Sequence, residues 1–475
     1  MVSGLFRQKL YSQLLILAAI PLAVIIGLTM NSDWYYGELI SMGVFGGGLA
    51  ILILIYPYWG LIISTASLLI IDVMPALPFV TSATQLMGGI TFGSYLAAYI
   101  LNRTSMPSMR LGREFNLMFL FVFWMMASNP TAATAPGNND RVWLVTFAQL
   151  LLLLFLANNV LDSAFKQRVF IGIYALFVLI TALFAILEML AGADDLQAFR
   201  ASGTAGGSNA AARYLTVGFV FLYYMYTKAP NFLVRLILLL AIGVVVLGLA
   251  STASRTGFLL LLVAVALFIL TSSKGSQSSR FGLGILLLIT ASAFLFLPDT
   301  WIEHLSTISS SIEDNTDTVK LRSELWRSAL NMWADNPVAG VGIGQFKVEL
   351  ESYAVIELKE QYYALGAHNM YLQILAETGM VGLFFFVSIL LSALLALFRA
   401  SRSANREMRE LATIWLIVFI VLLSGGITKH DHYEKLIWLC VGVASYFDYF
   451  NKSSTRTVEE ENASGPKTHI AAHNP

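Results

Sequence analysis

Long apolar stretches recur along almost the whole chain, separated by short polar connections. Each is close to the roughly 20 apolar residues that a helix needs to cross a bilayer. The first, from Leu10 to about Met30, is longer than a cleavable signal core and lacks a small-residue cleavage site, so we interpret it as a retained span. The further candidate spans lie at approximately residues 38–56, 58–72, 86–101, 114–128, 142–157, 169–190, 212–228, 232–250, 255–272, 281–297, 369–398, 411–424 and 435–449. The pattern predicts an all-α fold, a polytopic transmembrane helix bundle of about 12–14 spans.

Composition agrees with this pattern and excludes a soluble globule. Of the 475 residues, 57% are hydrophobic and only 12% are charged, and the mean hydropathy is +0.71. Basic and acidic residues number 29 each, so the net charge of zero gives no indication of a nucleic-acid partner. The single cysteine, Cys440, lies in an apolar run, which excludes an internal disulfide and a cysteine-rich metal site.

The distribution of cations predicts the orientation. With the N-terminus inside, the inner connections carry about fifteen Lys and Arg residues and the short outer connections about six. We therefore divide the chain into N-terminal transmembrane helices at 1–297, an outer helical loop at 298–367, C-terminal transmembrane helices at 368–450 and a tail at 451–475. The tail is polar and aperiodic, so we expect it to be disordered and cytoplasmic.

The outer loop contains one clear amphipathic helix, at 319–333, and a second predicted near 345–365. In the first helix, apolar residues recur at helical spacing, at Leu321, Leu325, Ala329 and Met332. The glycines between the two helices, Gly340, Gly342 and Gly344, resemble a phosphate-binding pattern, but no strand precedes them and a tight turn is favoured. A loop of this size has too small a core to stand alone, so we infer that it caps the outer face of the bundle.

Candidate chemistry also gathers at the outer face, because ionisable residues are nearly absent from the middle of the predicted spans. The connection 194–213 joins Arg200 and Arg213 to a Gly- and Ser-rich turn, whose backbone amides and guanidinium groups suit a phosphate or diphosphate. The alternative is a flexible loop whose arginines contact lipid headgroups. Arg255 opens a span from the outer side, where a helix N-terminus favours an anion; the alternative is an interfacial anchor.

His368 lies where the outer loop meets the next span, and it could serve as a general base because histidine titrates near neutral pH. The alternative is a structural histidine. Asn369 can cap the helix, and it forms a polar stripe with Gln373 and Glu377, so Asn369 and Glu377 join the candidate substrate-binding residues. We expect Gly379 and Gly382 to admit a neighbouring helix, bringing this one close to the arginine-bearing helices.

A weaker candidate is the connection with His430, Asp431, His432 and Glu434, which could hold a metal on the outer side or be a solvated connection.

Four segments together resemble the O-antigen ligase and O-antigen polymerase family of bacterial membrane glycosyltransferases. They are HNMYLQILAETGMVG from His368, FRASGTAGGSN from Phe199, SRTG from Ser254 and NPVAGVGIGQF from Asn336. The resemblance covers mainly residues 199–390.

The resemblance implies an enzyme that moves a glycan from undecaprenyl diphosphate to an acceptor hydroxyl at the periplasmic face of the inner membrane, without a metal or other cofactor. The acceptor would be lipid A-core for a ligase or the growing polysaccharide for a polymerase, and relatives that glycosylate proteins also occur. Family roles make His368 the base and Arg200 and Arg255 the cations that hold the diphosphate, whereas Arg213 matches no family motif. A lipid-linked glycan flippase is the alternative from another class; it would need polar residues through the midplane and inverted repeats, which the sequence lacks.

Overall fold

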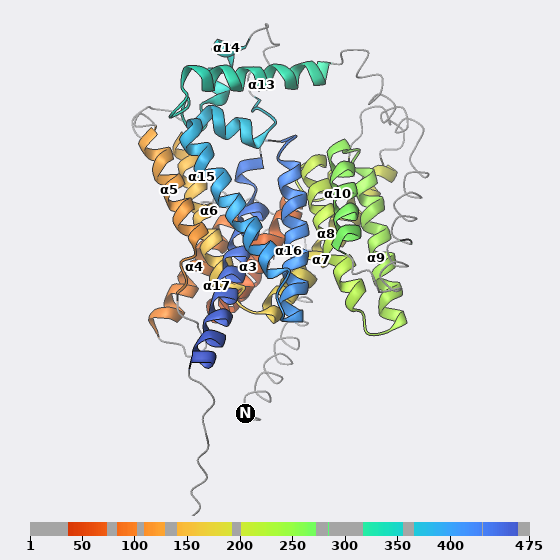
Figure 1. The fold of residues 1–475 in the computed structure, drawn as a ribbon. Helices are drawn as coiled ribbons and strands as arrows, with labels where there is room; N and C mark the ends of the chain where they lie inside the picture. The colour runs from red at the N-terminus through yellow and green to blue at the C-terminus, as the bar shows by residue number, and fades with distance from the viewer. Residues whose placement is uncertain are drawn as a thin grey trace, which may run out of the picture.

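The computed structural model describes residues 37–73, 83–101, 109–128, 140–191, 201–271, 284, 317–354, 365–429 and 431–463. Every regular element within these ranges is helical (Figure 1). The α-helices are α2 (Gly37–Ile55), α3 (Pro57–Ala66), α4 (Ala83–Ile100), α5 (Arg113–Ser128), α6 (Asp140–Val160), α7 (Ala164–Ala191), α8 (Ser208–Lys228), α9 (Phe232–Ser251), α10 (Arg255–Thr271), α13 (Asp317–Asp335), α14 (Phe346–Tyr353), α15 (Met370–Ala400), α16 (Arg406–Gly425) and α17 (Lys435–Ala463). Two 3₁₀ segments are η1 (Ser67–Val73) and η4 (Asp431–Tyr433). The predicted all-α class is confirmed.

Five of the described helices contain a segment long and apolar enough to cross a membrane: Trp143–Val160, Ala164–Ala191, Phe232–Ser251, Met370–Ala400 and Arg406–Gly425. Shorter apolar helices lie at Gly46–Ile55, Pro57–Asp72 and Arg255–Thr271. Large apolar side chains such as Phe232 and Leu240 are exposed on the outside of the bundle, as lipid contact requires. These features fit a polytopic helical membrane protein, while the predicted spans at 10–30 and 281–297 lie outside the described residues.

The described cations sort to the ends of the bundle as the charge pattern predicts. Arg168 pairs with Glu407 and Lys228 pairs with Glu410 at 2.6 Å, so the start of α7, the end of α8 and the start of α16 share one end. At the other end α13 lies across the bundle (Figure 1). These two pairs place Arg168 and Lys228, both assigned to inner connections, at the same end of the bundle.

Helix α13 packs its apolar stripe onto the bundle. Leu325, Ala329 and Met332 are fully buried and form one cluster with residues of α14 and the first turns of α15. The amphipathic helix predicted at 319–333 is therefore confirmed. The second predicted helix is shorter than expected, because the backbone turns to an extended conformation at Ala354; the residues after it, 355–364, lie outside the described ones.

Helix α15 is broken at Gly379, whose φ of +67° and ψ of −168° are not helical. The turn between α13 and α14 docks at the break: the amides of Val341 and Gly342 donate to the carbonyls of Ala376 and Glu377, each at 2.9 Å. The amide of Met380 in turn donates to the carbonyl of Pro337 at 2.9 Å. Backbone groups that the break leaves without helical partners thus find them in the turn.

The expectation that both glycines in α15 admit a neighbouring helix holds for Gly382, which packs against α5, but not for Gly379. A Cβ at Gly379 would meet the carbonyl oxygen of Val338 at 2.2 Å, so the close neighbour is a turn rather than a helix. Gly382 lies against the Thr378 side chain of its own helix and Trp124 of α5. Neither glycine has α8 or α10 among its nearest neighbours: Gly379 receives the turn, and Gly382 receives α5.

The predicted disordered tail is also partly wrong, since α17 continues as a helix to Ala463. Extending a helix that its buried apolar first part has already nucleated costs little, even for a polar sequence. The residues after 463 lie outside the described ones.

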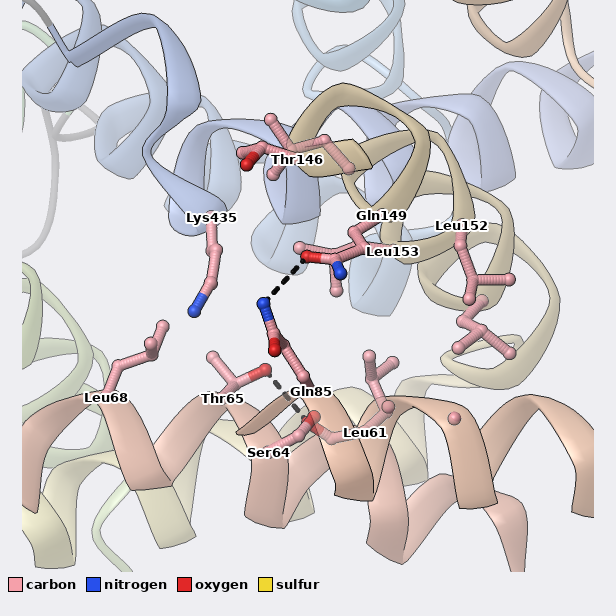
Figure 2. Close-up of a pocket in the computed structure, with 14 residues that line it drawn as sticks. Leu61, Ser64, Thr65, Leu68, Gln85, Thr146, Gln149, Leu152, Leu153 and Lys435 are labelled. Carbon is pink, nitrogen blue, oxygen red and sulfur yellow. Dashed lines mark hydrogen bonds between the residues drawn. The ribbon is translucent and has the colours of Figure 1, made fainter. Parts of the chain in front are cut away.

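A cavity of about 270 Å³ lies between α3, α4 and α6, close to the first residue of α17 (Figure 2). Its walls combine leucine side chains and two glycines with polar side chains from α3, α4, α6 and the start of α17.

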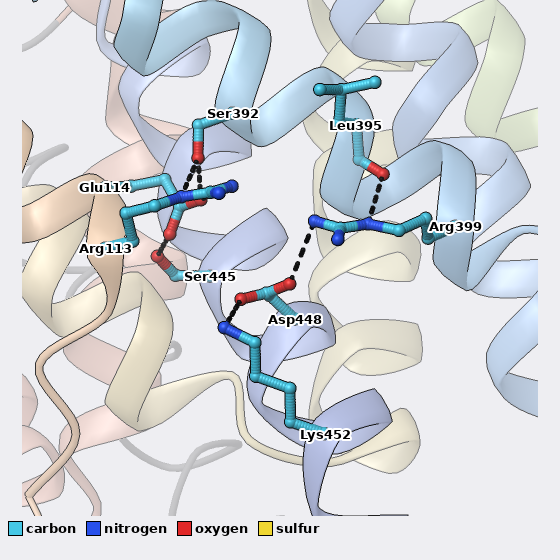
Figure 3. Close-up of polar contacts among 8 residues, drawn as sticks. All are labelled: Arg113, Glu114, Ser392, Leu395, Arg399, Ser445, Asp448 and Lys452. Atoms are coloured by element: carbon cyan, nitrogen blue, oxygen red, sulfur yellow. Dashed lines mark hydrogen bonds and ion pairs between the residues drawn. The ribbon is translucent and has the colours of Figure 1, made fainter. Parts of the chain in front are cut away.

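At the end of the bundle away from α13, the fully buried Glu114 joins three helices (Figure 3). Its carboxylate accepts hydrogen bonds from Ser445 of α17 at 2.6 Å and from Ser392 of α15, with Arg113 at 3.4 Å. A buried carboxylate is tolerated only when hydrogen-bonded, so this network locks α5, α15 and α17 together.

Candidate active site

The first turn of α10, which begins with Arg255, is held in place by a helix cap and by close packing against α8. Ser254 caps the helix by accepting a hydrogen bond from the Gly257 amide at 3.1 Å, and its hydroxyl donates to Asn209 at 2.8 Å. Gly257 lets α10 approach α8, because a Cβ there would meet the Ala212 side chain at 2.5 Å. The arginine itself is exposed at the helix N-terminus, where an anion is stabilised.

A second arginine, Arg322 of α13, lies within electrostatic reach of Arg255. Burial and the neighbouring Arg255 charge lower the pKa of the Arg322 guanidinium. Two guanidinium groups so placed favour an anion between them, because it relieves their repulsion. Sequence reasoning missed Arg322, although the signal was present: it lies three residues before Leu325, at the edge of the buried stripe.

Arg213 is engaged within the protein. It is almost fully buried in α8, and its Nη2 pairs with Oε2 of Glu434 at 2.8 Å. The Tyr214 hydroxyl lies 3.4 Å from the other carboxylate oxygen of Glu434. Removing one partner of such a pair would leave a buried charge, so Arg213 and Glu434 hold α8 to the start of α17.

The loop after α7 uses its backbone amides on carboxylates of the protein itself. Ser202 and Gly203 donate to Glu188 at 2.8 and 3.0 Å, and Gly206 donates to Asp72 at 2.7 Å. The hypothesis that these three amides bind a phosphate is therefore wrong. Arg200, the candidate that precedes them, lies outside the described residues.

His368 is held in a conformation that few side chains adopt. Its φ is +49°, and among the described residues Ala253, just before the Ser254 cap, is the other non-glycine residue with positive φ, at +54°. Such backbone strain clusters at functional sites, where the surroundings hold it in place. The imidazole is half-buried, directly before α15.

The polar stripe on α15 forms as predicted and fixes the surroundings of His368. Asn369 caps the helix by accepting from the amides of Tyr371 and Leu372 at 3.0 and 3.1 Å. Gln373 accepts from the Ala367 amide at 2.7 Å. Because these bonds lie on either side of His368, they set the backbone from which its imidazole projects.

Glu377, the last member of the stripe, is buried and accepts a hydrogen bond from the Gln373 side-chain amide at 2.6 Å. The Phe346 amide at the start of α14 lies 3.4 Å from the same oxygen. The predicted substrate-binding residues Asn369 and Glu377 thus have structural partners in the described part of the chain.

A turn at the end of α16 joins the two candidate positions. The carbonyl of Gly426 accepts from the Met370 amide at 2.8 Å, and the Thr428 hydroxyl lies 3.4 Å from that of Thr256. Met370 follows the candidate histidine by two residues, and Thr256 directly follows the candidate arginine of α10. The histidine and that arginine therefore lie on either side of one turn.

The connection after this turn forms no metal centre within the described residues. His432 is buried among aromatic rings and stacks on Phe147, with ring centroids 6.0 Å apart, and Glu434 is taken by Arg213. The described part of the chain contains no group of three or more His, Cys, Asp or Glu side chains able to hold a metal. His430 lies outside the described residues.

The fold and these positions define a polytopic helical membrane protein with a cationic site at the end of the bundle that α13 covers. A family model described as O-antigen ligase matches residues 240–387, which include Arg255, Arg322 and His368. The match shows that this segment, about a third of the chain, is similar to the O-antigen ligase family, as the motifs within it predict. No curated protein matches the chain significantly.

Proposed function

We propose that the protein transfers a glycan from undecaprenyl diphosphate to an acceptor hydroxyl at the periplasmic face of the bacterial inner membrane. The observation that carries this proposal is the turn after α16, which contacts both the helix start that follows Arg255 and the helix start that follows His368. Arg322 of α13 adds a second positive charge within electrostatic reach of Arg255. A paired guanidinium site suits a diphosphate, and a histidine suits proton transfer from a hydroxyl.

The chemistry follows from where charge develops. The acceptor oxygen forms a bond to the anomeric carbon while the bond from that carbon to the diphosphate breaks, and His368 takes the hydroxyl proton. The diphosphate leaves with additional negative charge, which the fixed guanidinium groups of Arg255 and Arg322 stabilise. Arg213 acts indirectly, by holding Glu434 and the connection that precedes α17.

The acceptor distinguishes a ligase, which uses lipid A-core, from a polymerase, which uses the growing polysaccharide. Deletion of the gene tests both. Free long glycan chains without a core attachment would indicate the ligase, whereas single repeat units on the core would indicate the polymerase. Unchanged glycans would contradict the proposed function.

The arginine at the start of α10 gives a sharper test. We expect Arg255→Lys to lower glycan transfer by about a hundredfold, nearly as much as Arg255→Ala, because a point charge cannot reproduce bidentate contact with a diphosphate. Arg235→Lys is the matched control, since Arg235 is exposed on α9, which packs beside α10. If Lys at position 255 retains most of the transfer measured in proteoliposomes, Arg255 acts only as a charge or an anchor.

The sidedness can be tested with single cysteines. The native Cys440 is buried, so it gives a silent background. We expect Ala334→Cys on α13 to react with a membrane-impermeant thiol reagent in intact spheroplasts, and Ala404→Cys at the opposite end to react only after lysis. The reverse pattern would place the site on the cytoplasmic face.

A further inference from the structure

The cavity between α3, α4 and α6 is polar on one side and apolar on the other. Gln85 of α4 donates to Gln149 of α6 at 3.3 Å, and Thr146 lies one turn before Gln149 (Figure 2). Farther along the same two helices the walls are leucines and glycines. The polar side therefore lies toward the starts of α4, α6 and α17, and the apolar side lies farther along α4 and α6. On the α3 wall, the hydroxyls of Ser64 and Thr65 donate to a backbone carbonyl of their own helix.

Lys435 supplies a positive charge at the polar side. Figure 2 shows its side chain extending into the cavity, toward Gln85 and Leu68. Among the described residues, no salt bridge is formed by its amine. The neighbouring carboxylate of Glu434 acts on it electrostatically but is paired with Arg213 at 2.8 Å. An ammonium group beside an apolar cavity is stabilised by an anionic ligand.

The apolar side has room for a chain. A Cβ built on Gly88 or Gly89 would meet no atom within 4 Å, so these glycines leave open space opposite the leucines of α6. The volume of about 270 Å³ is slightly below that of a typical small-molecule pocket, which suits one segment of an apolar chain rather than a whole lipid.

We propose that this cavity binds a lipid phosphate, with part of its apolar chain beside Gly88 and Gly89 and its phosphate at Lys435. A glycerophospholipid of the membrane and a polyprenyl phosphate share this chemistry. Neither Arg255 nor His368 lines this cavity, so its occupancy can be measured without the transfer reaction.

Photo-crosslinking to the purified full chain in nanodiscs tests the proposal. The probes are phosphatidylglycerol, a polyprenyl phosphate and neutral diacylglycerol, each with a diazirine in its apolar chain. We expect both phosphate lipids to label the segment 146–156 of α6, about tenfold more than diacylglycerol does, because a charge-assisted contact is lost in the neutral lipid. Equal labelling by diacylglycerol would overturn the proposal.

Two substitutions with matched controls complete the test. Gly89→Leu should fill the apolar side and reduce labelling of α6 by about tenfold, whereas Gly93→Leu, on the same helix and also in open space but not lining the cavity, should leave it unchanged. Lys435→Gln should reduce labelling by the phosphate lipids to the level of diacylglycerol, whereas Lys452→Gln on the same helix should not.

Wild-type labelling in either Gly89→Leu or Lys435→Gln would overturn the proposal. If the proposal holds, equal labelling by the two phosphate lipids identifies the abundant membrane phospholipid as the occupant. Stronger labelling by the polyprenyl phosphate identifies that lipid instead.

Discussion

Replacement of His368 with asparagine is expected to lower glycan transfer by at least about a hundredfold, because general-base catalysis contributes about 10²–10⁴-fold. Asparagine is the informative substitution, since it tolerates the positive φ that His368 adopts but cannot accept a proton as a base. Turnover is measured in proteoliposomes with a lipid-diphosphate-linked glycan donor. Binding of the donor should persist, because the guanidinium groups are untouched.

The matched control is His368→Gly, which adopts the same backbone conformation without strain. Added imidazole should restore part of the lost turnover in this variant if the ring acts as a base. Near-normal turnover of the asparagine variant would remove His368 from the mechanism and leave it a structural residue.

Gly340→Ala is expected to produce the largest structural effect. Gly340 has a φ of +71°, and a Cβ there would meet the backbone of Glu377 and Thr378 at 2.4 and 2.5 Å. Backbone cannot move aside as a flexible side chain would, so the turn must leave α15 and lose the hydrogen bonds of Val341 and Gly342. We expect a destabilisation of about 3 kcal/mol or more, from the lost hydrogen bonds and the left-handed backbone.

A lower melting temperature in detergent and a loss of transfer would report this change. Gly243→Ala on α9 is the control, because a Cβ there meets no atom within 4 Å, and alanine in a helix is expected to be neutral or stabilising by up to about 1 kcal/mol. If Gly340→Ala melts and turns over like the wild type, the docking of the turn onto α15 does not organise the site.

Features that depend only on residues close together in the chain were predicted correctly from the sequence. The spacing of Leu325, Ala329 and Met332 gave α13 and its buried face, and the position of Asn369 gave the cap of α15. These predictions succeed because helical periodicity and capping involve residues within about a turn of each other. The helix that continues past 450 shows where local reasoning fails, since a polar sequence extends a helix that its buried apolar first part has begun.

The candidate site residues, by contrast, were identified individually from the sequence, but their neighbours in the folded protein could not be predicted. Arg255 and His368 stood out by residue type at the expected ends of spans, but nothing near them in the chain indicated that one turn after α16 contacts both helix starts. The sequence also could not show that the Ser202 amide donates to Glu188 rather than to a phosphate, because this depends on where the end of α7, which carries Glu188, lies in the folded protein.

The sequence by itself determined a helical membrane bundle, the amphipathic cap helix, and the arginine and histidine that mark one end of the bundle. Only the tertiary structure decided that Arg322 lies within electrostatic reach of Arg255, that Arg213 pairs with Glu434, and that α15 breaks where a turn docks. The physical reason is that helical periodicity and charge alternation depend on residues close together in the chain, whereas these pairings join elements that are distant in the chain. Their partners are selected by how the helices pack, because each buried charge and each freed backbone group must find a partner in space.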